Sequence, residues 1–135
     1  MNTPQTETSR APHVQQAYDA WHRLQADLYR DTVPPCPFCG DFANHRVVER
    51  GAHMIIVENQ FPYQRFDHQQ VDKHYLLIPL EHVDRLSDLS IEAHTEYLNL
   101  YEAYHETGFS LFTRSVIDTS RSIPLHLHTH LFSYK

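Results

Sequence analysis

Three histidines alternate with other residues near the end of the chain, in the stretch LHLHTHLF at residues 125–132. Successive side chains of a β-strand point to opposite faces of a sheet. A strand here therefore has two different faces, one that lines a site and one that packs on a core. The first face carries His126, His128 and His130. The second carries Leu125, Leu127, Thr129 and Leu131.

The spacing of this row limits what it can bind. Residues two apart in a strand are separated by roughly 6.6 Å, so His126 and His130 lie about 13 Å apart. Three such rings cannot easily converge on one ion, although neighbouring rings can share one. We therefore expect one end of the row to bind metal and the remainder to face a substrate. Two alternatives stay open: a solvated polar strand face, and a purely metal-binding H-x-H-x-H site.

The two cysteines of the chain, Cys36 and Cys39, form a C-x-x-C pair in PPCPFCG. Such a pair is typical of half a zinc site or of a redox motif, or consists of two incidental thiols. A thioredoxin-like pair should begin a helix after a strand, whereas this one follows two prolines and leads into Gly40. The surroundings favour a zinc-binding knuckle. Histidines would then have to supply the other two ligands of a tetrahedral site.

Size and charge exclude several classes of function. A chain of 135 residues predicts one domain, and residues 1–12 are expected to be a frayed polar start. The net charge is −6 with no run of Lys and Arg, which argues against a surface for duplex nucleic acid. No apolar stretch is long enough to span a bilayer, and no signal segment is evident. We expect a cytoplasmic protein.

Periodicity and breaker residues predict an α+β fold with a mainly antiparallel sheet and an extra N-terminal helix. One amphipathic helix is expected over 12–30, with Tyr18 and Trp21 in the core. A second is expected from a Ser90 cap to about Thr107. Its inward residues would be Ile91, Leu98 and Tyr101. The expected strands are 46–50 and 53–58, joined near Gly51, then 74–79, 109–116 and 125–132, with a long polar loop over 59–73.

Three landmarks together resemble the histidine triad (HIT) family. HLHTHLF at 126–132 is similar to the triad signature, with Thr129 where an apolar residue is usual. HYLLIPLEHV at 74–83 resembles a second landmark, a histidine, an apolar strand and then Pro-Lys-x-His, with Leu80 in place of the lysine. CPFC resembles the cysteine pair of the zinc-bearing branch. The three occur in the family's order from about residue 34 to 132.

This resemblance implies a HIT-like domain with a zinc knuckle over 34–135. The part over 1–33, with a disordered start and the amphipathic helix, is an addition to it. The resemblance also implies a structural zinc held by Cys36, Cys39, His82 and His126. It implies His128 as a nucleophile, with His130 and His74 near the phosphate. Nucleotide contacts would come from Phe38 beside the base, Asn59 at the ribose and Ser122 through its hydroxyl.

The implied activity is that of a nucleotide-binding hydrolase or transferase. It would cleave at the α-phosphate of nucleoside phosphoanhydrides or phosphoramidates through a nucleotidyl-histidine. The alternative is a non-catalytic nucleotide-binding or zinc-stabilised interaction module. The expected partner is a small nucleotide, and related proteins are commonly homodimers. The helix over 12–30 would either pack on the domain or cover the dimer face.

Overall fold

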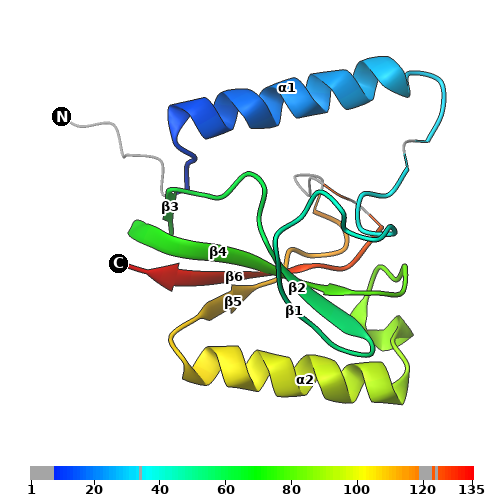
Figure 1. The fold of residues 1–135 in the computed structure, drawn as a ribbon, viewed down its shortest axis with the longest axis vertical. Helices are drawn as coiled ribbons and strands as arrows, with labels where there is room; N and C mark the ends of the chain where they lie inside the picture. Colours follow the sequence, from blue (N-terminus) through cyan, green and yellow to red (C-terminus); the bar gives the residue numbers. More distant parts are fainter. Residues whose placement is uncertain (1–7, 34, 119–122, 124) are drawn as a thin grey trace.

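The computed structural model describes residues 8–33, 35–118, 123 and 125–135. Its described part has three layers, with one antiparallel sheet between two helices (Figure 1). Helix α1 (Pro12–Leu28) lies over one face of the sheet, and helix α2 (Ile91–Glu106) lies against the other. The predicted α+β class with a mainly antiparallel sheet and an added N-terminal helix is confirmed.

The sheet follows the strand order β1-β2-β4-β6-β5, and β3 pairs with β4 outside this path. All of these pairings are antiparallel. Strand β6, which contains the end of the histidine row, therefore lies between the long β4 and the edge strand β5. The strands are β1 (Val47–Arg50), β2 (Met54–Glu58), β3 (Arg65–Phe66), β4 (Gln69–Pro79), β5 (Ser110–Phe112) and β6 (Thr129–Tyr134), and a short 3-10 helix η1 spans Leu86–Asp88.

Continuous apolar runs form the centre of the sheet because both of its faces are covered. In β2, Met54 and Ile56 pack towards α2, while Ile55 and Val57 pack on the opposite face. In β4, Leu77 joins the first group, and Leu76 and Ile78 join the second. An antiparallel sheet with one face in water would show alternation instead. The core is thus divided into two halves by the sheet.

Helix α2 begins where the sequence predicts, because the Ser90 hydroxyl accepts a hydrogen bond from the Ala93 N–H at 3.1 Å. The predicted inward face is wrong: Ile91 and Leu98 are 81% and 61% exposed, and Tyr101 is also exposed. The helix is rotated about its axis relative to the predicted orientation, so all three residues lie on the solvent side. The inward stripe, spaced four and three residues apart, is Ala93, Tyr97, Leu100 and Tyr104.

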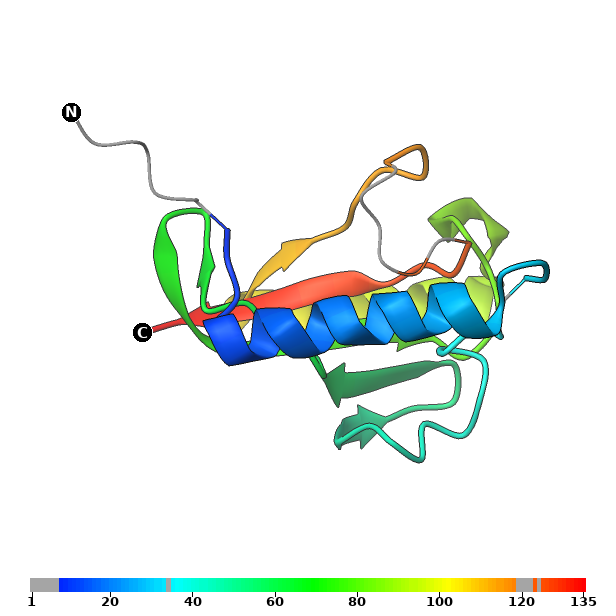
Figure 2. The same ribbon diagram turned by 90° about the horizontal axis from the view of Figure 1, so that it is seen from above.

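Helix α1 forms as predicted but ends at Leu28, two residues early, and none of its residues is buried. Leu24 and Leu28 are exposed, and the expectation that Tyr18 and Trp21 are core residues is wrong. These two rings instead contact Phe61 edge-on or tilted, with ring centroids 5.6 and 6.1 Å away. Figure 2, seen from above, shows the helix lying over the sheet. In the described part of the chain, no helix has the length and apolarity needed to cross a membrane.

The N-terminal segment before α1 is anchored from Ser9 onward. Ser9 accepts backbone hydrogen bonds from Gln64 and Arg65 and donates one to the Arg65 carbonyl. The predicted frayed start is therefore wrong for the residues just before the helix, because this bridge ties them to β3. Residues 1–7 of the predicted start lie outside the described residues.

The predicted loop over 59–73 is wrong in its second half, which forms a hairpin of β3 and β4. Asp67 and His68 connect the strands, both with positive φ, 52° and 65°. Such values suit a two-residue hairpin turn, which usually contains Asn-Gly or Asp-Gly. The sequence has Asp-His at this turn, so the usual sequence signal for a hairpin is absent. Strand β4 consequently begins at Gln69 rather than His74.

The last two strands are shorter at the end that faces the site than the sequence predicts. Strand β5 stops at Phe112, and β6 begins only at Thr129. Leu125 has a positive φ of 68° and is 59% exposed, so it is not part of the core-facing set. Leu127 and Leu131 do pack towards α2 as predicted. The first two histidines of the row, His126 and His128, therefore precede the regular strand, and His130 lies within it.

The hairpin predicted near Gly51 is confirmed and is held by α2. The Glu96 carboxylate accepts backbone hydrogen bonds from Ala52, His53 and Met54 at 3.1, 3.0 and 2.6 Å. A Cβ at Gly51 would lie 2.5 Å from Glu96 Oε2. A side chain at this position would displace the Glu96 carboxylate from its backbone partners.

Candidate metal centre and histidine pocket

The structure brings together the four residues predicted to bind metal. Cys36 and Cys39 lie in the turn between α1 and β1, His82 follows β4, and His126 precedes β6. Their ligand atoms all lie within 4.8 Å of one another. Cys39 Sγ lies 2.9 Å from His82 Nδ1 and 3.4 Å from His126 Nδ1. His126 Nδ1 lies 3.3 Å from Cys36 Sγ and 3.2 Å from His82 Nδ1.

These separations are close to the edges of a tetrahedron around one ion. Ligand bonds of about 2.3 Å to sulfur and 2.0 Å to nitrogen give edges of roughly 3.3 to 3.8 Å. The buried His126 is oriented for this role, because its Nε2–H donates to the Pro79 carbonyl at 2.9 Å. That bond leaves a lone pair on Nδ1, the atom that faces the cysteines. The four residues can therefore hold a metal ion.

The thiols of this cluster differ in their surroundings. Cys39 is exposed and Cys36 is partly covered. Burial raises the pKa of the Cys36 thiol to about 11. Metals bind the thiolate, so loading this site releases protons and is favoured at higher pH.

His128 is held in one tautomer by the backbone of its neighbour. Its Nδ1 lies 3.0 Å from the carbonyl oxygen of His126, which only accepts hydrogen bonds. Nδ1 therefore carries the proton, and the neutral ring keeps a lone pair on Nε2. The ring is 8% exposed and lines a pocket. An unprotonated imidazole nitrogen at a pocket wall is a suitable nucleophile or acceptor.

His130 and His74 form a second, buried pair. The Tyr63 backbone N–H donates to His74 Nδ1 at 3.1 Å, so the neutral His74 ring has its proton on Nε2. That Nε2–H donates to His130 Nδ1 at 2.9 Å. The neutral His130 ring must then carry its own proton on Nε2. The pocket therefore has a donor at His130 beside the acceptor at His128, with ring centroids 5.4 Å apart.

Burial keeps this pair neutral. Burial and the nearby charges of Arg10 and His128 lower the pKa of His74 to about 3. Burial also lowers the pKa of His130 well below its usual value, and His74, His128, Arg114 and Arg10 lower it further. Both rings are uncharged at neutral pH, so the hydrogen-bond directions given above hold there.

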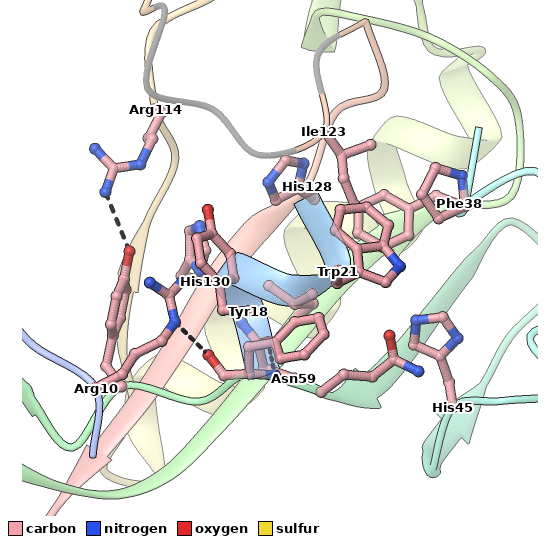
Figure 3. Close-up of a pocket in the computed structure, with 15 residues that line it drawn as sticks. Arg10, Tyr18, Trp21, Phe38, His45, Asn59, Arg114, Ile123, His128 and His130 are labelled. Carbon is pink, nitrogen blue, oxygen red and sulfur yellow. Dashed lines mark hydrogen bonds between the residues drawn. The ribbon is translucent and has the colours of Figure 1, made fainter. Parts of the chain in front are cut away.

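The pocket in front of these rings encloses about 650 Å³, including its open mouth (Figure 3). Its two ends differ in chemistry. One end is aromatic, with Phe38, Trp21 and His45. The other carries the guanidinium groups of Arg10 and Arg114. His128 and His130 lie between them, and among the described lining residues there is no carboxylate.

The two predicted nucleotide-contacting residues that the structure describes both line this pocket. Phe38 is also a core residue, 2% exposed, and its ring lies 5.2 Å from that of His128. The Asn59 side chain accepts from the Phe61 N–H at 2.8 Å, and its Nδ2 lies 3.2 Å from His74 Nε2. Ser122, the third predicted contact, lies outside the described residues.

Several residues of the pocket were not identified from the sequence. Arg10, Arg114 and Tyr63 come from the segment before α1, the segment after β5 and the loop before β3. No spacing links residues so far apart in the chain. Trp21 had a detectable signal, as an aromatic residue on a helix, but this signal equally fits a core residue.

Comparisons with known proteins give the fold and no sequence relative. A scan against protein-family models finds no match, and a search of curated proteins finds none either. Among solved structures, a HIT family hydrolase from Clostridium thermocellum is 19% identical, with a TM-score of 0.56 over 77% of this chain and 94% of that one. A histidine triad protein from Clostridium difficile is 17% identical, with a TM-score of 0.54 over 74% and 88%.

A third solved structure has a similar fold. It is a HIT family hydrolase from Legionella pneumophila, 18% identical, with a TM-score of 0.52 over 75% of this chain and 94% of that one. The structural similarity establishes a shared fold. At identities this low it does not extend to function, which must be argued from the site of this chain. The chain has the HIT fold that the three sequence landmarks predict.

Proposed function

We propose that this protein is a nucleotide hydrolase or transferase of the HIT type, which cleaves at the α-phosphate of a small nucleotide. The reaction would pass through a nucleotidyl group on His128. The bond broken would be a phosphoanhydride or a phosphoramidate. Duplex nucleic acid and membranes are not among the proposed partners, and we propose a cytoplasmic location.

One observation carries this proposal: the His126 carbonyl fixes the proton of His128 on Nδ1. The Nε2 of the neutral ring is then unprotonated, and an imidazole attacks phosphorus near pH 7 through an unprotonated nitrogen. In the first step, the Nε2–P bond forms and the bond from phosphorus to the leaving group breaks. The leaving group departs with the electron pair. In the second, water or another acceptor attacks phosphorus, and His128 is released.

The neighbouring pair supports the same reaction. His130 offers an Nε2–H that can donate to a non-bridging phosphate oxygen, because His74 occupies its Nδ1. A fixed donor of this kind stabilises charge as it develops and needs no reorganisation during the reaction. The Tyr63 backbone N–H, which donates to His74 Nδ1, holds His74 in place. We assign phosphate binding to His130 and positioning of His130 to His74.

We further propose that the metal at Cys36, Cys39, His82 and His126 is zinc. Two thiolates and two imidazoles are a common ligand set for structural zinc. When bound, the ion would join the cysteine turn to the start of β6, and four protein ligands would leave no position for water or substrate. Its role would be to fix His126, whose carbonyl orients His128.

The experiment that tests the function is a turnover assay on purified protein with nucleoside 5′-phosphoramidates and nucleoside triphosphates. The wild type should release the nucleoside monophosphate. His128→Ala should lower kcat by at least about 10³-fold, because the nucleophile is removed. His105→Ala, an exposed histidine on α2, should leave the rate unchanged. Binding of the monophosphate without turnover would instead support the non-catalytic alternative, and equal turnover by His128→Ala would refute the assignment.

A further inference from the structure

Two arginines lie at the end of the pocket that the reaction described above does not use. Arg10 comes from the segment before α1, and Arg114 comes from the segment after β5. They are 104 positions apart in the sequence and meet at one side chain, Tyr63. Figure 3 shows both guanidinium groups on the side of His130 away from Phe38 and Trp21.

The Arg10 guanidinium is held in place by neutral partners. Arg10 lies over the rings of Tyr18 and Tyr63, at 3.7 and 4.4 Å from their centroids. Its Nε–H donates to the Phe61 carbonyl at 2.8 Å. The Ser9 bridge to Arg65 fixes the backbone just before it. Arg10 is therefore positioned by two aromatic faces and a carbonyl, and it has no carboxylate partner among the described residues.

Arg114 is also partly withdrawn from water. Its side chain is 22% exposed, its Nη2 lies 3.5 Å from the Tyr63 hydroxyl, and its Nη1 lies 3.5 Å from Asp118. Within the described ranges, Asp118 is the one carboxylate found within 4.0 Å of either arginine. Asp118 is paired with Arg114, so the positive charge at this end of the pocket exceeds the negative charge of its described partners and favours an anionic ligand.

Both charges act on the histidine pair. The positive charges of Arg114 and Arg10 each contribute to lowering the pKa of His130. The two guanidinium groups are thus within electrostatic reach of the atoms assigned to the α-phosphate. They lie on the opposite side of those atoms from the aromatic end of the pocket.

We propose that Arg10 and Arg114 form a subsite for an anionic leaving group, so that the preferred substrates are nucleoside phosphoanhydrides rather than phosphoramidates of neutral amines. This inference rests on the proposed function for the reaction at His128. With the nucleoside at the aromatic end, the groups beyond the α-phosphate reach the arginines. The bond between the α-phosphorus and the bridging oxygen breaks. The β-phosphate departs with that oxygen and the electron pair, and so gains one negative charge. Guanidinium groups bind such oxyanions through charge-assisted hydrogen bonds.

The kinetic test compares two substrates with the same nucleoside. One is the triphosphate, cleaved between the α- and β-phosphates, and the other is a 5′-phosphoramidate with an uncharged amine as leaving group. Arg10→Gln and Arg114→Gln should each lower kcat/KM for the triphosphate by about 10-fold or more, because a hydrogen bond to a charged group is lost. The phosphoramidate rate should change by less than about 2-fold. Arg23→Gln, an exposed arginine of α1, is the matched control and should change neither rate.

Equal losses with both substrates would overturn the proposal, because the arginines would then serve the α-phosphate or the pocket as a whole. Unchanged rates with both would overturn it as well. If neither substrate is turned over, the proposed function fails, and calorimetric titration with inorganic pyrophosphate still decides the subsite. Pyrophosphate should bind the wild type and Arg23→Gln equally, and the double variant Arg10→Gln/Arg114→Gln at least about 10-fold more weakly. Equal binding by all three proteins would show that the subsite does not exist.

Discussion

His74 and His130 illustrate how much of this site depends on the position of single protons. A backbone N–H at Tyr63 sets the proton of His74, which sets that of His130, while the His126 carbonyl sets that of His128. As a result, the His130 Nε2–H is a donor and lies beside the acceptor Nε2 of His128. The sequence places the three triad histidines on one face, but it contains no information about these tautomers, because each depends on a backbone group brought close only by folding.

The pH dependence of stability tests the buried state of His74. Its pKa falls from an ordinary value of 6.5 when unfolded to about 3 when folded, so between these values the unfolded chain binds more protons. The free energy of unfolding must therefore decrease as the pH falls below about 6.5. The contribution of this residue between pH 7 and pH 5 is about 2 kcal/mol.

Urea unfolding of the wild type and His74→Gln at both pH values measures this contribution. The glutamine retains a donor and an acceptor but does not titrate. The wild type should lose about 2 kcal/mol more than the variant on acidification. A metal bound at Cys36 and its partners is common to both proteins and cancels in the difference. An identical pH dependence would mean that His74 is not buried as described.

At the scale of elements, the cysteine turn and the start of β6 form one unit. Phe38 lies between the cysteines and packs with Phe42, and its ring lies 5.7 and 5.2 Å from His126 and His128. A change in the turn is therefore transmitted directly to the histidine row. The C-x-x-C spacing made this turn recognisable in the sequence. Its contact with the triad followed from the resemblance and not from any local pattern.

Metal analysis tests this unit. We expect one tightly held zinc per chain, which Cys36→Ser and His126→Ala should each abolish. Because binding energy at a structural zinc site is folding energy, the melting temperature should fall by about 10 °C or more. His105→Ala should retain both the zinc and the melting temperature. The zinc assignment fails if the purified wild type contains none, or if Cys36→Ser keeps both its zinc and its melting temperature.

The sequence pattern of α1 predicts that a helix forms but not where that helix packs. Its apolar residues recur at helical spacing, which identifies the helix correctly. The same pattern does not reveal what the helix packs against. Tyr18 and Trp21 turn out to line the pocket, and Leu24 and Leu28 remain exposed. A pattern of apolar residues indicates which face avoids water, and a pocket wall satisfies that requirement as well as a core does.

At the scale of the whole molecule, one face of α2 is left uncovered by the described residues. Ile91, Leu98 and Tyr101 are exposed on α2, and α1 lies on the opposite side of the sheet (Figure 1). Of the two alternatives expected for α1, packing on the domain and covering the dimer face, the structure shows the first. The central strands of the sheet and the cap of α2 could be predicted, because they have strong local signals, whereas the hairpin of β3 and β4 could not. The inward stripe of α2 could not, since its apolar residues occur on more than one side.

We propose that this face pairs with a second copy of the chain. Light scattering at high micromolar concentration should give twice the mass of one chain, because exposed apolar area of this kind is stabilised by burial. Leu98→Asp should shift the equilibrium towards the monomer. Leu24→Asp, which alters an exposed leucine of α1, should not. A monomeric wild type at that concentration would contradict the proposal.

The central claim, that His128 carries the nucleotide during the reaction, is tested most directly by trapping the intermediate. A reaction with a substrate labelled at its α-phosphate is quenched in alkaline denaturant within the first turnover, and the labelled peptide is sequenced by mass spectrometry. The account predicts label on His128 in the wild type, none in His128→Ala, and wild-type labelling in His105→Ala. Single-turnover release of the monophosphate with no label on the protein, or label on another residue, would contradict it.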